Sequence, residues 1–285
     1  MKNTKINQQK WLQKINDTMM IGGKSKRTFN NYKSQLNKLF NYYDENTHID
    51  KLNEDDLLDY FKLNYINRNF SSNTLNLSIC SVRFLFSICF NKELNKKKLP
   101  SCKLKKRIPT IIPKSEFLTF INEESSLRHK CWLLLGFCSG LRAEEIAHLK
   151  IENINSKEHK LKILGKGNKE RFTRLPDIVI KFLRLYCKKY HIIDKEGYIF
   201  KCHKDADIPS SDTIVNYFSN LMKKYNKFGV YTFHSLRRSF ATYYLQSGGS
   251  LLKLQSMLGH TNLNTTTIYL HLSHNFNELE DNRYV

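Results

Sequence analysis

The chain has 285 residues, 40% of them apolar, which allows one large domain or two ordinary ones and excludes global disorder. Its 47 lysines and arginines exceed the 26 acidic residues, giving a formal charge of +21 and a pI near 9.6. Both halves share this excess of positive charge. Nucleic acid is therefore the expected partner, with a generally basic soluble protein as the alternative.

Cysteine usage and hydropathy point to a cytoplasmic protein. The seven cysteines form no Cys-x-x-Cys pair and several lie in apolar runs, which predicts reduced thiols. The polar N-terminus MKNTKINQQK has no apolar signal core, and we expect no membrane segment because no run of about eighteen apolar residues is evident. No histidine and cysteine set has four-ligand zinc spacing, so we expect neither metal nor cofactor.

Taken in chain order, the first half is predicted to be helical. Residues 27–43 place apolar side chains at helical spacing on one face, and Lys33 lies away from that face. A second helix should follow Asn53, an N-cap residue with acids in the next turn. A third should follow Ser71 and run through SICSVRFLFSICF. The aromatic stripes are more typical of a core than of a base-stacking surface.

Residues 95–113 differ in composition from the segments on both sides. They contain three prolines and seven basic residues but no acid, which breaks regular structure and predicts a domain boundary. We expect a helical domain over residues 1–107, a basic linker over 108–114 and a second domain from 115. A solvated charge run and a DNA-contacting linker explain the basic residues equally well; among them are Lys103, Lys105, Lys106 and Arg107.

The second half is predicted to be helical around a β-hairpin. The segment CWLLLGFCSG at 131–140 is apolar nearly all round, as a buried helix would be, and ends at Gly140. Residues 160–164 and 171–175 alternate on either side of a glycine-rich turn, which predicts the hairpin. Further helices are predicted at residues 177–190, 211–227, 235–246, 250–258 and 264–272. The fold class is therefore mainly α with a small hairpin (α+β).

Six residues of the second half have the chemistry for metal-free phosphodiester cleavage: Arg142, Lys166, His234, Arg237, His260 and Tyr269. Arginines can neutralise phosphate oxygens, a tyrosine oxygen can attack phosphorus, and histidine and lysine can serve as base and acid. Each feature also has a simpler explanation. Arg142 could form an ion pair with Glu145, Lys166 could be an exposed turn lysine, and the segment from residue 250 could be a helix-turn-helix DNA reader.

The order and spacing of these residues resemble the tyrosine recombinases, also called the phage integrase family. Each motif alone is weak, whereas five in the family's order make coincidence implausible. The helical first half looks like the family's core-binding domain, and the length is similar to that of its short, two-domain members. The matching motifs are Gly140-Leu-Arg-Ala-Glu-Glu145, Gly165-Lys-Gly-Asn-Lys-Glu-Arg171, His234-Ser-Leu-Arg237, Leu258-Gly-His260 and Tyr269.

The resemblance implies a SAM-like core-binding domain and a catalytic domain, 115–272, that form a C-shaped clamp on double-stranded DNA. It implies that Arg142 and Arg237 hold the scissile phosphate, to which His260 donates a further hydrogen bond. Lys166 would protonate the leaving 5′-oxygen. His234 would assist the nucleophile Tyr269, and Glu145 would support the arginine site.

The implied activity is site-specific recombination through a 3′-phosphotyrosine and a Holliday junction, by four protomers that are monomers before synapsis. Residues 273–285 would dock on a neighbouring protomer through Phe276 and Leu279. The open alternatives are a DNA-binding regulator on the same fold and a phosphotyrosine topoisomerase. Arg238 departs from the family's usual histidine. The residues expected to contact DNA are Lys33, Lys103, Lys105, Lys106, Arg107, Lys169, Arg171 and Arg238.

Overall fold

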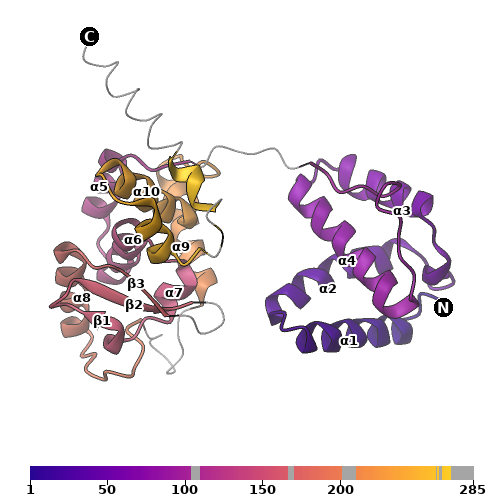
Figure 1. Ribbon diagram of the computed structural model, residues 1–285, viewed down its shortest axis with the longest axis horizontal. Coiled ribbons are helices and arrows are strands. Elements are labelled where there is room, and N and C mark those ends of the chain that lie inside the picture. The colour runs from indigo at the N-terminus through magenta and orange to yellow at the C-terminus, as the bar shows by residue number, and fades with distance from the viewer. Residues whose placement is uncertain (104–109, 166–169, 201–209, 261, 263–264, 271–285) are drawn as a thin grey trace, which may run out of the picture. The chain divides into compact units, whose positions relative to one another are not determined.

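The computed structural model describes residues 1–103, 110–165, 170–200, 210–260, 262 and 265–270. The chain divides into two compact units, Met1–Arg107 and Ile108–Val285 (Figure 1). Both units are built mainly from helices, and the described part of the second also holds a three-stranded sheet. The fold class expected from the sequence is therefore confirmed.

The first unit is a bundle in which α1 (Lys5–Ile21), α2 (Lys26–Tyr42) and α4 (Ser72–Phe90) pack against one another. Between α2 and α4 lie a 3-10 turn (Ile49–Lys51), α3 (Glu54–Phe61) and a π-helical turn (Lys62–Ile66). The stripe predicted in residues 27–43 is the core face of α2, where Leu36, Leu39 and Phe40 are buried.

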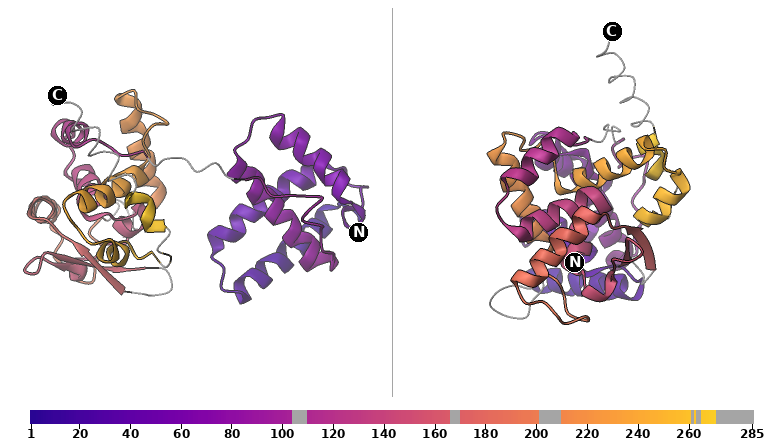
Figure 2. Two further views of the ribbon diagram at one scale, coloured as in Figure 1. Left: turned by 45° about the horizontal axis from the view of Figure 1, so that its top comes forward. Right: turned by 90° about the vertical axis from the view of Figure 1, so that its left-hand side faces the viewer.

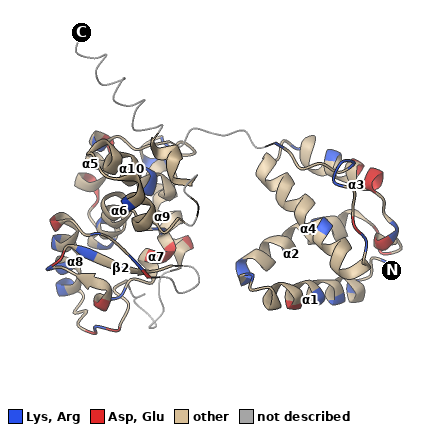
Figure 3. Ribbon diagram, in the orientation of Figure 1, with Lys and Arg blue, Asp and Glu red and all other residues tan. Residues whose placement is uncertain are grey.

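The helix starts of this unit follow the local sequence. The Asn53 side chain accepts hydrogen bonds from the N–H groups of Asp55 and Asp56, and the Asp56 carboxylate accepts one from the Asn53 N–H. Ser71 caps α4 in the same way through Thr74. Caps of this kind each stabilise a helix by about 1 kcal/mol. Figure 3 shows the acidic first turn of α3 in red, while basic residues occur in both units.

Within the described residues, α4 is the one helix long and apolar enough to cross a membrane by length and composition alone. The sequence had suggested no such segment, because serines and Arg83 interrupt its apolar run. Leu75, Ile79, Leu85 and Phe86 of this helix are buried in the core of the first unit. Core helices of globular domains have the same composition.

The second unit is organised around α6 (Leu127–Ser139). This helix contacts α7 (Ala143–Ala147), α8 (Asp177–Lys189), α10 (Phe233–Gln246) and strand β3 (Glu170–Arg174) (Figure 2). It is buried from Cys131 to Gly136, as its apolar sequence predicts. Gly140 ends it in the left-handed conformation, φ 70°, where a Cβ would collide with the ring of Phe240.

The sheet has the order β1-β2-β3, all antiparallel, and contains β1 (Ile154–Asn155), β2 (Lys160–Leu164) and β3 (Glu170–Arg174). The predicted hairpin is confirmed, with β3 starting one residue early. Strand β1, which follows a 3-10 turn (Ile151–Asn153), was not predicted. Ile163 pairs with Arg171, and β3 alternates so that Arg171 and Thr173 are buried while Phe172 and Arg174 are exposed.

The remaining helices of the second unit agree closely with the sequence pattern. They are α5 (Lys114–Glu123), α9 (Ser211–Lys224), α11 (Leu251–Leu258) and the helical residues 265–270.

The linker expected over residues 108–114 needs correction for its described part. Ile111 and Ile112 are buried, and the Ile112 N–H donates to Ser239 Oγ at 2.8 Å. Lys114 already belongs to α5. Residues 111–114 are therefore part of the second unit. The sequence predicted a linker because prolines and lysines surround the two isoleucines. The free energy gained by burying these isoleucines outweighs the local tendency to form a solvent-exposed loop.

Candidate active site

Arg142 follows the turn at Gly140 and is the N-cap residue of α7. Its backbone N–H donates to Glu145 Oε2 at 2.9 Å, and its Nη1 donates to Glu145 Oε1 at 2.8 Å. The side chain is still 39% exposed. Part of the guanidinium therefore faces solvent, where an anionic group can reach it.

Arg237 lies on α10 and is 1% exposed. Its Nη1 donates to the carbonyl of Gly140 at 2.7 Å, and its Nη2 donates to the carbonyl of Leu258. Burial, assisted by the charge of Arg142, lowers the pKa of Arg237 to about 9, so the group stays charged at neutral pH. Its buried Nε has no hydrogen-bond partner among the residues that the structure describes, and an anionic ligand would satisfy it.

Glu145 is the carboxylate that gathers the arginines. Its Oε2 accepts a hydrogen bond from Arg171 Nη2 at 2.8 Å and lies 3.6 Å from Arg237 Nη1. Burial by itself would raise the pKa of Glu145, but the hydrogen bond and charge of Arg171 and the charge of Arg237 hold it below its ordinary value. The carboxylate is therefore ionised, and the cluster of three arginines keeps a net positive charge.

The prediction that Arg171 contacts DNA does not fit its position. Its side chain is 7% exposed, with Nη2 on Glu145 and Nε donating to the carbonyl of Met257 at 2.8 Å. Alternate residues of β3 face the interior, and Arg171 is one of them, whereas its neighbour Phe172 is exposed. The sequence did not indicate which face of β3 is buried, because the outward-facing Phe172 is apolar.

His260 connects the arginines to the tyrosine. Its Nε2 lies 3.5 Å from Arg237 Nη2, and its Nδ1 is 2.9 Å from Oγ1 of the fully buried Thr266. Burial, together with Arg237 and the other arginines, lowers the pKa of His260 to about 4. The imidazole is thus neutral at pH 7. No sequence signal singled out Thr266, because Thr265 and Thr267 flank it and only the packing distinguishes them.

Tyr269 is 6% exposed, and its ring is stacked on His260 at a centroid distance of 6.4 Å and an interplanar angle of 21°. Burial raises its pKa, and the charges of Arg237, Arg238 and Arg142 oppose the rise. The phenol is therefore protonated at neutral pH and needs a base before it can attack.

His234 can be that base. It lies on the first turn of α10 and is exposed to solvent. The protein atoms around its ring and the charges of Arg237 and Arg238 lower its pKa to about 4. It is therefore neutral and able to accept a proton at pH 7.

The segment from residue 250 does not have the packing expected of a separate helix-turn-helix reader. Leu254, Met257 and Leu258 are buried in one cluster with Tyr269, while Ile268 is 36% exposed. Among the residues that the structure describes, no three histidine, cysteine or acidic side chains lie together as a metal site would require.

The other predicted site residues fall into two groups. Lys33 and Lys103 are exposed, and Arg238 is partly exposed on α10. These positions are open to a DNA backbone. The rest lie outside the described residues: Lys105, Lys106, Arg107, Lys166, Lys169 and the tail at 273–285.

Two family models match the chain. The phage integrase family matches residues 113–275, and the phage integrase N-terminal SAM-like domain matches residues 11–96. The chain is 28% identical over 267 residues to the tyrosine recombinase XerD of Staphylococcus aureus, covering 88% of this chain and 90% of XerD. It is 35% identical over 179 residues to a tyrosine recombinase of Thermosipho africanus, covering 60% of each protein.

Solved structures show the same fold. The XerH site-specific recombinase bound to palindromic difH substrate, in a post-cleavage complex, has a TM-score of 0.70 at 21% identity, covering 90% of this chain and 79% of XerH. A lambda integrase (75-356) dimer bound to a COC′ core site has a TM-score of 0.70 at 17% identity, covering 92% of this chain and 94% of the integrase chain.

Proposed function

This chain belongs to the phage integrase family, and we propose that it is a site-specific recombinase that cuts and rejoins double-stranded DNA. One observation carries the proposal. Arg142 and Arg237 both lie at a single carboxylate, Glu145, and His260, 3.5 Å from Arg237 Nη2, stacks on the buried phenol of Tyr269. A DNA-binding regulator on this fold has no need of a phenol in such surroundings.

The arginines and His260 would bind the scissile phosphate. Arg142 presents exposed N–H groups, and the buried Nε of Arg237 has no partner within the described part of the chain. A guanidinium fork matches two phosphate oxygens. A bound phosphate would also offset the positive charge that now lowers the pKa of His260. His260 would then donate a hydrogen bond to the phosphate.

Strand cleavage would follow as an exchange of phosphoester bonds. The Tyr269 oxygen attacks phosphorus, its proton passes to His234, and the bond from phosphorus to the 5′-oxygen breaks. Lys166, between β2 and β3 in the sequence and outside the described residues, would protonate that oxygen. The new 3′-phosphotyrosine is itself a phosphodiester, so the number of phosphoester bonds is unchanged. A 5′-hydroxyl can therefore reverse the reaction without ATP.

Tyr269→Phe tests the nucleophile. The variant should bind its DNA site with unchanged affinity but form no covalent adduct with a nicked substrate on a denaturing gel. Tyr244→Phe, on the same helix as Arg237, is the matched control and should still form the adduct. An adduct from Tyr269→Phe would show that another residue is the nucleophile.

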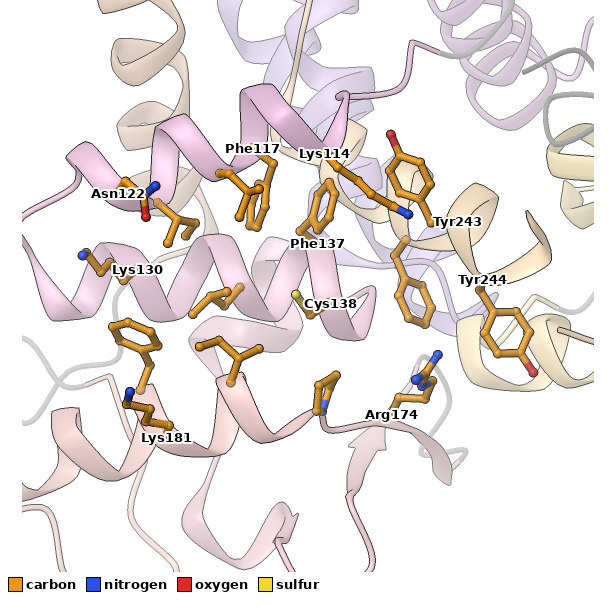
Figure 4. Close-up of a pocket in the computed structure, with 17 residues that line it drawn as sticks. Lys114, Phe117, Asn122, Lys130, Phe137, Cys138, Arg174, Lys181, Tyr243 and Tyr244 are labelled. Atoms are coloured by element: carbon orange, nitrogen blue, oxygen red, sulfur yellow. The ribbon is translucent and has the colours of Figure 1, made fainter. Parts of the chain in front are cut away.

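Assembly on DNA is the next part of the proposal. We propose that four protomers pair two duplexes through a Holliday junction, and that the tail at 273–285 docks on a neighbouring protomer. A groove of about 630 Å³ between α5, α6, α8 and α10 would receive the tail (Figure 4). The stacked rings of Phe117 and Phe137 line it, with centroids 3.8 Å apart.

Charge supports this match between groove and tail. The groove residues include Lys114, Lys130, Arg174 and Lys181 but no acid. The tail sequence SHNFNELEDNRYV places Phe276 and Leu279 among three acids. Phe276→Ser should reduce recombinant product by roughly tenfold or more, the scale for losing an interface anchor, and leave half-site cleavage intact. Asn282→Ser is the control. Unchanged recombination by Phe276→Ser would refute docking through this residue.

The family relationship also guides the wider setting. We propose action in the cytoplasm, where its DNA substrate lies, without metal or cofactor. The task would be integration or excision of a mobile element, or resolution of replicon dimers. The basic residues outside the site, including Lys33 and Lys103, would contact the DNA backbone and make binding strongly dependent on salt.

A further inference from the structure

Arg171 is a buried cation to which the reaction proposed above gives no role. It lies on β3 opposite Ile163, and its side chain is 7% exposed. A buried charge is costly unless it is paired and hydrogen-bonded. The contacts that hold this guanidinium therefore indicate what it does.

One side of the Arg171 guanidinium fixes Glu145. Arg171 Nη2 donates to Glu145 Oε2 at 2.8 Å, and that same oxygen accepts from the Arg142 N–H at 2.9 Å and lies 3.6 Å from Arg237 Nη1. The other oxygen accepts from Arg142 Nη1. The rotamer of Glu145 therefore sets the position of the exposed Arg142 guanidinium, and Arg171 sets the rotamer of Glu145.

The other side fixes the turn that leads to His260. Arg171 Nε donates to the carbonyl of Met257, one of the last carbonyls of α11, which have no partner inside their own helix. Gly259 wraps over the same side chain, since a Cβ there would lie 2.9 Å from Arg171 Cδ. Gly259 also has φ 64°, which a side chain would strain. Arg171 therefore helps to fix the position of the backbone that leads to His260.

We infer that Arg171 is a positioning residue for strand cleavage: a single guanidinium braces Glu145, and through it Arg142, against the turn that carries His260. The inference rests on the proposed recombinase function. Arg171 contacts neither substrate nor reacting atoms. It acts by keeping phosphate-binding groups from α7 and from the segment after α11 in one arrangement, where a shift of about 1 Å can cost roughly a hundredfold in rate.

Two substitutions separate position from charge. Arg171→Lys keeps the charge but cannot make both hydrogen bonds from one planar group, and Arg171→Gln removes the charge. On a nicked substrate we expect adduct formation to slow by roughly tenfold or more in Arg171→Lys and further in Arg171→Gln. DNA affinity and its salt dependence should stay at wild-type values. Arg184→Gln is the matched loss of an exposed arginine on α8, bonded to Ser156 Oγ at 3.4 Å, and should cleave normally.

A double-mutant cycle identifies the route of action. If Arg171 acts through Glu145, Arg171→Lys should add little to the loss already caused by Glu145→Gln. Additive losses would overturn the route through Glu145. Wild-type cleavage by both Arg171 variants would overturn the whole inference. So would a salt slope reduced by about 0.9, because that change means that Arg171 itself neutralises a phosphate.

A readout without DNA keeps this inference separate from the proposed function. Arg171 is one of the charges that lower the pKa of His260. In an NMR titration the pKa of His260 should therefore rise in Arg171→Gln and stay nearly unchanged in Arg184→Gln. Failure of the wild type to cleave any DNA would refute the function, while an unmoved pKa in Arg171→Gln would refute the brace. If neither Arg171 variant folds, the residue serves folding and the positioning role is wrong.

Discussion

Replacing Arg237 by methionine separates the effect of this residue on the free energy of unfolding from its effect on DNA cleavage. The pKa of Arg237 falls to about 9, chiefly through burial, so keeping the charge in the fold costs roughly 5 kcal/mol. Its removal leaves the carbonyls of Gly140 and Leu258 without this donor, at about 1–3 kcal/mol each. Glu145 is not left unpaired, because Arg142 and Arg171 still bond to it.

These two effects are of similar size and opposite sign. We therefore expect Arg237→Met to change the melting temperature of the second unit by less than about 10 °C, at roughly 2–4 °C per kcal/mol. Leu135→Ala, which empties a fully buried position of α6, should cost about 2–5 kcal/mol and serves as the structural comparison. Adduct formation by Arg237→Met should nevertheless fall at least about a hundredfold, the scale for removing one donor to a developing oxyanion.

Calorimetry of both variants, with a cleavage assay on the nicked substrate, tests this reasoning. A melting temperature for Arg237→Met lower than that of Leu135→Ala would show that the arginine is mainly a structural residue. Cleavage within a few-fold of wild type would remove it from the phosphate site. The expected outcome is a stable protein that does not cleave, because active sites retain buried charges at the expense of stability.

Further outcomes follow from the same site. Arg142→Ala leaves Oε1 of the buried Glu145 without its donor, so it should cost about 1–3 kcal/mol of stability, and it should slow cleavage at least about a hundredfold; near-normal cleavage would contradict the assignment. Because the pKa of His260 is lowered to about 4, the folded state binds fewer protons than the unfolded state between about pH 4 and 6.5. The unfolding free energy should therefore drop as the pH falls through this window, and less so in His260→Gln; equal slopes in urea titrations would refute this. Neutralising Lys103, Lys105, Lys106 and Arg107 should weaken the salt dependence of DNA binding by about 0.9 for each phosphate that these side chains neutralise; an unchanged slope would mean a solvated basic segment.

Local sequence signals predicted most of the helices and the hairpin, although α1 was not predicted. Caps such as Asn53 and Ser71, the glycine at 140 and the alternation of β2 and β3 act within a few residues of themselves. They do not depend on distant partners, so they can be read directly. The predicted linker failed at Ile111 and Ile112 for the opposite reason. Their burial depends on α10, more than a hundred residues away.

The candidate site shows the same difference between features with local signals and features that depend on distant partners. Motif order and residue chemistry are properties of the chain, so they predicted the residue types of the site: two arginines, two histidines, a lysine and Tyr269. Three arrangements became evident only in the folded chain: three arginines share Glu145, Arg171 faces inward, and Thr266 contacts the imidazole of His260. These arrangements depend on the rotamers and burial of residues from α7, β3, α10 and α11. Pairing across such distances is fixed by packing of the whole unit, which no local pattern encodes.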